Sequence, residues 1–197
     1  MDFRIRLKVL LMALLIIVLN SDAQTESTRG ISKTFGDLIV FTECEPVNEY
    51  EVLDEINITS LPASLMSRPP VNYVDVRNLY IRAVNKMNLS ADGIIFTLNK
   101  SGVSSAVIIS FIDNSIANDT SIVSINRGLY CFVDSEPIDS FKKLGPVINK
   151  LNLYNVPFKI AREGFLKRCN KQFPKAQGVV FNFKLNAPNS ANAIEFN

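Results

Sequence analysis

One segment of the chain, residues 103–113 (VSSAVIISFID), carries apolar side chains on both faces of the strand that it predicts. Side chains alternate between the two faces of a strand, so a strand with one solvated face shows apolar residues at every second position only. Here Val107 and Ile109 alternate with Ala106 and Ile108. We therefore expect this strand to lie in the centre of a sheet.

Further strands are predicted before and after this segment. Short apolar runs that are partly β-branched and bounded by turn residues predict strands at 36–42, 51–59, 93–99, 121–125, 129–133 and 178–185. Connections that contain glycine, at 99–102 and 126–128, favour two hairpins.

Two segments have the periodicity of an amphipathic helix. The first begins near Asp75, a suitable N-cap, and continues to Met87 with apolar residues three or four positions apart. The second, 158–173, places one apolar stripe on its core side, formed by Phe158, Ala161, Phe165, Cys169 and Phe173. Residues 141–154 also favour helix, with a break at Gly145-Pro146.

The order of these elements predicts an α+β fold, an antiparallel sheet with helices packed on one side. A β-sandwich with few helices is the alternative. We expect a single globular domain over residues 35–186, a flexible N-terminus over 24–34 and a flexible tail over 187–197. No internal repeat is apparent.

The start of the chain predicts a secretory signal peptide over residues 1–23. Arg4, Arg6 and Lys8 precede an apolar run from Val9 to Leu19, and small residues follow. This run is too short to span a membrane, and no later run is longer, so we expect a secreted, extracellular protein without a membrane span.

Secretion makes a disulfide the expected state of two of the three cysteines. The sequence does not decide among the three possible pairings. Cys44, which follows a strand, is the partner that we predict for Cys169, and Cys131 is then the odd thiol. The odd cysteine could form a disulfide-linked dimer. A buried free thiol and a reactive thiol are the alternatives for Cys169.

Four sequons make the chain a predicted glycoprotein. The acceptor motif Asn-x-Ser/Thr occurs at Asn57, Asn88, Asn99 and Asn118.

The chain contains no histidine, which removes the commonest general base and the commonest metal ligand. We therefore expect no enzymatic activity, no catalytic residues, no cofactor and no metal. A carboxylate hydrolase is the one enzyme class that stays open, with Glu43, Glu45, Glu49 and Glu51 as its candidate residues.

Charge is distributed unevenly along the chain. Residues 34–67 hold seven acidic and no basic side chains, whereas residues 141–184 hold ten basic and one acidic. The two segments could simply neutralise each other in the fold. The alternative is an outward basic face on the second helix that docks an anionic partner, formed by Lys159, Arg162, Lys167, Arg168 and Lys171.

These observations predict a secreted, non-enzymatic glycoprotein that acts by binding. The expected partner is an anionic macromolecule or a cell-surface protein, docked through the basic helical face. A net charge of only +2 argues against nucleic acid. An extracellular carrier of a small hydrophobic ligand is the alternative, because the chain has thirteen phenylalanines.

Overall fold

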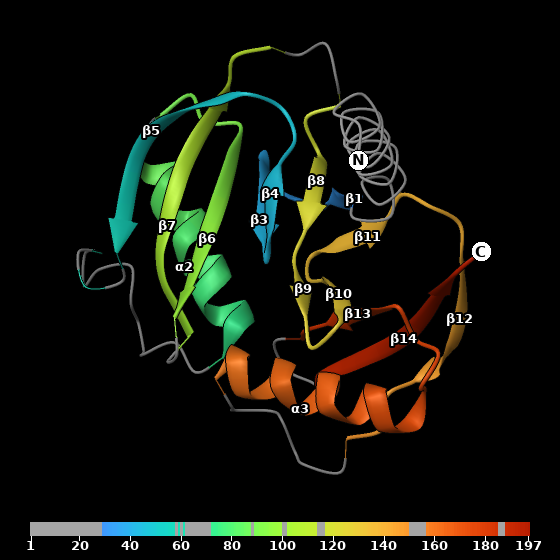
Figure 1. Cartoon of the computed structure of the whole chain (residues 1–197). Coiled ribbons are helices and arrows are strands. Elements are labelled where there is room, and N and C mark those ends of the chain that lie inside the picture. Colours follow the sequence, from blue (N-terminus) through green and yellow to red (C-terminus); the bar gives the residue numbers. More distant parts are fainter. Residues whose placement is uncertain are drawn as a thin grey trace, which may run out of the picture.

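The structure is a computed structural model that describes residues 29–57, 59, 61, 72–87, 89–99, 102–113, 117–149, 157–184 and 188–197. These residues form two helices and three mostly antiparallel sheets, so the protein is rich in strand (Figure 1). A sheet-rich fold with few helices agrees with the predicted class, although three sheets replace the single sheet that we expected.

The elements fall into two successive sets, which we call the first lobe (residues 29–113) and the second lobe (residues 117–197). The first lobe contains β1 (Arg29–Ser32), β2 (Thr34–Phe35), β3 (Leu38–Thr42), β4 (Cys44–Pro46), β5 (Tyr50–Asn57), α2 (Tyr73–Lys86), β6 (Gly93–Asn99) and β7 (Gly102–Phe111). The second lobe contains β8 (Thr120–Val123), β9 (Ile125–Asn126), β10 (Leu129–Phe132), β11 (Ser135–Pro137), β12 (Phe141–Pro146), α3 (Phe158–Gln172), β13 (Gly178–Asn182) and β14 (Ser190–Phe196).

The second lobe repeats the fold of the first, element by element. The first lobe forms a sheet of order β2-β3-β6-β7-β5, and the second forms one of order β9-β10-β13-β14-β12. The registers also agree: Ile39 pairs with Gly93 in a parallel ladder, as Tyr130 pairs with Gly178. Our expectation of no internal repeat was therefore wrong.

Even the irregularities of the two sheets are equivalent. The edge strand β5 shifts register between Val52 and Asp54, and the edge strand β12 shifts between Lys143 and Gly145. Gly93 and Gly178 are both kept small by an aromatic ring: an added Cβ would lie 3.1 Å from Phe41 and 3.2 Å from Phe132, respectively.

The third sheet, of order β11-β1-β8-β4, joins the lobes by exchange of strands. The first-lobe strand β1 pairs with β11 of the second lobe, and the second-lobe strand β8 pairs with β4 of the first. Thr42 and Val133, which occupy equivalent positions, form a bridge with each other. The lobes are therefore related by an internal two-fold axis that passes between these two residues.

The core has two layers because strand side chains alternate between the faces of the lobe sheets. Val40, Ile94 and Ile108 point to one face, where they share a hydrophobic cluster with Tyr80 of α2 and Phe165 of α3. Their neighbours along the strands form a second cluster against the exchanged sheet, with Phe41, Ile109, Phe132 and Ile194 as members. β7 lies inside its sheet, between β6 and β5, which confirms the central strand predicted at 103–113.

Both helices that we predicted from periodicity are present. Asn72, rather than Asp75, caps α2: its side chain accepts a hydrogen bond of 3.0 Å from the backbone N–H of Asp75. The stripe of Phe158, Ala161, Phe165 and Cys169 on α3 is buried as expected.

Three other predictions about elements were wrong. Residues 141–146 form the edge strand β12 rather than a helix, because an edge position tolerates Pro146 and pairing with β14 satisfies the backbone. The expected flexible tail contains β14, and the expected flexible N-terminus contains β1 and the first residue of β2. The predicted signal peptide, residues 1–23, lies outside the described residues.

The exchange of strands predicts that the lobes stay together without a covalent link. If a protease site is introduced into residues 114–116 of the full chain and cleaved after folding, the two halves should co-elute as one species in size-exclusion chromatography. They should separate only in denaturant, because β1 and β8 each pair across the two lobes. Halves that separate in native buffer would contradict the exchange.

Candidate functional site

A buried ion pair joins α2 of the first lobe to the second lobe. Nη1 of Arg77 donates to both carboxylate oxygens of Asp134, at 2.8 and 2.9 Å. The hydroxyl of Tyr73 also donates to Asp134, at 2.6 Å, and lies 2.6 Å from the Thr42 hydroxyl. Burial, together with the Asp134 carboxylate, raises the pKa of Tyr73 well above its usual range. The hydroxyl therefore stays protonated and can donate to Asp134. The guanidinium of Arg77 covers the ring of Phe35 at 3.8 Å.

An equivalent ion pair joins α3 of the second lobe to the first lobe. Arg162, at the position of Arg77, donates through Nη1 to Glu43, at the position of Asp134. Glu43 also accepts from Asn126 at 3.0 Å and from the Ser124 hydroxyl at 3.3 Å. The two pairs therefore cross the internal two-fold axis in opposite directions.

The two carboxylates occupy strained backbone positions. Glu43 has φ of 58° and Asp134 has φ of 49°, in the left-handed region that favours glycine. A side chain is kept at both positions, and in both it accepts from an arginine of the opposite lobe. Each strained position therefore makes a specific contact. Both contacts are buried: the side chains of Arg77 and Asp134 are 9% and 12% exposed, and those of Arg162 and Glu43 are 8% and 10% exposed.

The burial of Arg162 corrects the predicted docking face. Its guanidinium is committed to Glu43 and Glu163 and is not available to a partner. The periodicity of α3 placed Phe158 and Phe165 in the core but did not show that an arginine lies beside them. The other four predicted residues stay on the surface: Lys167 and Lys171 are exposed, and Lys159 and Arg168 are partly buried.

The acidic segment meets the basic segment at one point only among the described ion pairs, the contact of Glu43 with Arg162. Glu51, Asp54 and Glu55 are exposed on the edge strand β5, whose equivalent in the second lobe, β12, exposes Lys142 and Lys143. The acidic edge and the basic edge are therefore separate surfaces, one in each lobe.

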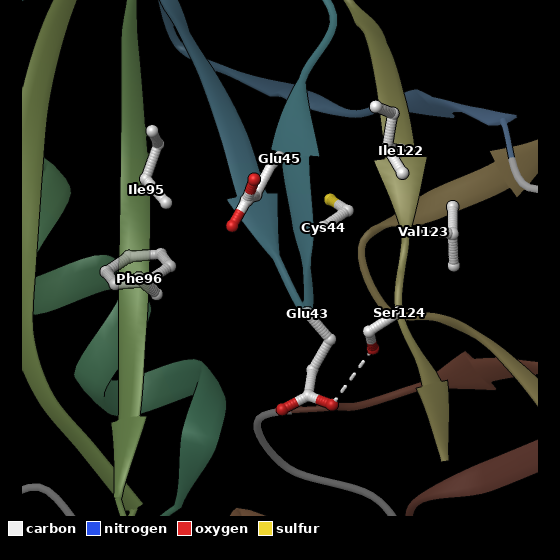
Figure 2. A pocket seen from close by; sticks show the side chains of 8 residues that line it. All are labelled: Glu43, Cys44, Glu45, Ile95, Phe96, Ile122, Val123 and Ser124. Atoms are coloured by element: carbon white, nitrogen blue, oxygen red, sulfur yellow. Dashed lines mark hydrogen bonds between the residues drawn. The ribbon is translucent and has the colours of Figure 1, made fainter.

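A cleft opens beside Glu43, between β6 of the first sheet and the exchanged strands β4 and β8. It has a volume of about 440 Å³ and is lined by Glu43, Cys44, Glu45, Ile95, Phe96, Ile122, Val123 and Ser124. Figure 2 shows Glu45 and Ile95 on opposite sides of this cleft, with Glu43 and Ser124 joined by a hydrogen bond at one end. Two of the four candidate carboxylates for hydrolysis, Glu43 and Glu45, thus lie in one cleft, whereas Glu51 lies on β5.

All three cysteines are free and buried, so the predicted disulfide between Cys44 and Cys169 is not formed. The two residues belong to different core layers: Cys44 packs under the exchanged sheet and Cys169 packs on the helix side. Burial argues against the alternative of a reactive Cys169, because it shields the thiol from solvent and raises its pKa to about 11. Burial also raises the pKa of Cys131 to about 12 and that of Cys44 above its ordinary value.

The four sequons have different surroundings. Asn57 is exposed at the end of β5, and Asn118, in the turn before β8, accepts a hydrogen bond of 2.7 Å from Asn48. Asn99 ends β6, but its side chain is not described, and Asn88 lies outside the described residues.

The described part of the chain contains no group of three or more His, Cys, Asp or Glu side chains able to hold a metal ion. Within that part, neither helix is long and apolar enough to cross a membrane.

No protein-family model, no curated protein and no solved structure matches the chain.

The sequence held a weak signal of the crossed pairs that we did not recognise. Glu45-Pro46 and Glu136-Pro137 are equivalent dipeptides, and one residue separates each of them from a preceding carboxylate, Glu43 or Asp134. An aligned repeat would have placed Glu43 against Asp134 and Arg77 against Arg162.

Removing one member of a buried ion pair should cost much more stability than removing one member of an exposed pair. Arg77→Met leaves Asp134 buried without its cation, so the free energy of unfolding in urea should fall by about 3–5 kcal/mol. Lys33→Met, which breaks the exposed pair between Lys33 and Glu136, is the control and should cost less than about 1 kcal/mol. Similar losses for the two variants would contradict the role assigned to the Arg77 pair.

The raised thiol pKa values predict cysteines that are inert in the folded protein. At pH 8 the thiolate fraction of Cys169 should be about one in a thousand, and that of Cys131 lower still. Titration with Ellman's reagent should therefore detect almost no thiol in native buffer and three per chain in denaturant. Detection of only one thiol in denaturant would show that two of the cysteines form a disulfide and would contradict the structure.

Proposed function

We propose that this protein is a secreted, non-enzymatic glycoprotein that docks the acidic surface of an extracellular macromolecule. The docking surface is the basic face of α3, which we define as Lys159, Lys167, Arg168 and Lys171. Among the described residues none of these four side chains has an ion-pair partner, so their charge is available to a ligand.

Comparison of the two lobes carries this proposal. Lys159 and Arg168 stand where the first lobe has Val74 and Ala83, both buried on α2. Because the two lobes have the same fold, the fold itself does not require these charges. Residues that differ in chemistry at equivalent positions are therefore candidates for function rather than for structure.

The charge of the second lobe extends beyond α3. Lys142 and Lys143 on β12 replace Glu51 and Val52 of β5, and Lys175 is exposed after the end of α3. A cluster of cations on one lobe attracts an anionic surface over a distance comparable to the Debye length, about 8–10 Å at physiological salt. The expected binding is thus electrostatic and dependent on salt.

The phenylalanines favour an ordinary core over the alternative of a carrier. Phe158, Phe181 and Phe183 pack against one another with ring centroids 5.1 and 5.8 Å apart, and Phe158 also contacts Tyr73 at 5.0 Å. These rings fill the interior between the helices and the sheets. We therefore do not propose a hydrophobic ligand.

Charge reversal on α3 tests the proposal. A Lys167→Glu, Arg168→Glu and Lys171→Glu variant should elute from heparin at a much lower salt concentration than the wild type, because three cations become three anions. The matched control is Arg82→Glu with Lys86→Glu, which reverses the exposed cations at the equivalent positions of α2. This control should elute close to the wild type, and circular dichroism should show that both variants are folded.

Two results would contradict the docking surface. One is a triple variant that is folded and elutes with the wild type. The other is a shift for the α2 control in proportion to its two reversed charges, which would show that heparin responds to net charge and not to the face of α3.

A further inference from the structure

A second cleft contains the equivalents of Glu45, Ile122 and Ser124, although its other wall is β2 and not β13, the equivalent of β6. This second cleft, of about 510 Å³, borders β1, β2 and β11 and includes Ile31, Lys33 and Glu136 in its lining. Ile31 and Glu136 are equivalent to Ile122 and Glu45, because each isoleucine pairs with the glutamate on the exchanged neighbouring strand. The two clefts therefore offer the same pair of side chains in the same register.

The second cleft contains its own cation. Nζ of Lys33 lies 3.1 Å from Oε1 of Glu136. The backbone N–H of Lys33 donates to the carbonyl of Asp134 at 2.8 Å, and this bond fixes the start of the side chain beside the glutamate.

The first cleft lacks that cation but keeps the backbone that would present it. Ser124 occupies the position of Lys33, and its N–H donates to the carbonyl of Glu43 at the same distance, 2.8 Å. The hydroxyl of Ser124 turns to Glu43 (Figure 2), and within the described residues Glu45 has no ion-pair partner. The equivalent carboxylate is thus left open to an external cation.

Apolar side chains on both sides of the first cleft can contact the methylene chain that carries an ammonium group. Ile122 is 51% exposed beside Glu45, and Ile95 stands across the cleft (Figure 2). A methylene chain can lie on these side chains while its charged end reaches the carboxylate. The carboxylate of Glu43 does not compete, because Arg162 neutralises it.

We propose that the cleft at Glu45 binds a primary alkylammonium group, namely a lysine side chain supplied by a partner protein. The bound lysine reproduces from outside the contact that Lys33 makes with Glu136 inside the chain. Its ammonium pairs with Glu45, and its methylene stem lies between Ile95 and Ile122. This site is distinct from the basic face of α3 and does not depend on the function proposed for that face.

Because Ser124 and Lys33 are equivalent, exchanging the two residue types should fill the first cleft and open the second. Ser124→Lys should fill the first cleft with an internal cation, as Lys33 fills the second. Lys33→Ser should open the second cleft and add a binding site at Glu136. Glu45→Gln should weaken binding by up to about fivefold, the effect of one exposed ion pair, whereas Glu136→Gln should leave the first cleft unchanged.

The measurement is an NMR titration of the full chain at low salt with the peptide Ac-Gly-Lys-Gly-NH₂ at millimolar concentrations. The amide signals of Ile122 and Ser124 should shift in the wild type and stay constant with Ac-Gly-Gln-Gly-NH₂. They should stay constant in Ser124→Lys, and Lys33→Ser should add shifts at Ile31. The spectrum of each variant shows that it is folded.

Three outcomes would overturn the proposal. The first is undiminished binding by Glu45→Gln or Ser124→Lys. The second is the absence of new shifts in Lys33→Ser. The third is binding of n-butylammonium without binding of the peptide, which would assign the cleft to a free amine and not to a partner protein.

Discussion

Two crossed ion pairs at the internal two-fold axis constrain the whole molecule. Arg77 belongs to the first lobe and its carboxylate, Asp134, to the second; for Arg162 and Glu43 the lobes are reversed. A buried charge without a partner is strongly unfavourable, so neither lobe can satisfy its own arginine alone. The exchanged sheet also requires both lobes, because β1 and β8 each pair with a strand of the opposite lobe. The architecture is that of a two-fold dimer within one chain.

A duplicated fold lets equivalent positions be compared within one molecule. Where both lobes keep the same chemistry, as at Gly93 and Gly178, the fold accounts for the residue. Where they differ, the fold does not explain the difference. Arg168 in place of Ala83, and Ser124 in place of Lys33, are differences of this kind. The first adds a charge that no described residue neutralises, and the second removes the cation from an otherwise equivalent glutamate.

Local patterns in the sequence predicted much of the secondary structure, because alternation and helical spacing follow from burial. They identified the central strand β7, the buried stripe of α3 and most of the hairpin strands. They failed where long-range pairing decides the outcome: β12 is a strand because β14 lies beside it, and β14 is ordered for the same reason. The predicted disulfide was wrong because Cys44 and Cys169 belong to different layers of the core. The burial of Arg162 could be seen only once the repeat was recognised, since its partner is 119 residues away.

Native-state hydrogen exchange, followed by NMR, tests most directly whether the lobes form one cooperative unit. Amides of β3 and β6 should have the same free energy of opening as their equivalents in β10 and β13, because unfolding of either lobe breaks the exchanged sheet and both buried ion pairs. All four strands should respond alike to added denaturant. If one lobe exchanges through an opening that leaves the other protected, the crossed ion pairs do not couple the lobes and the central claim fails.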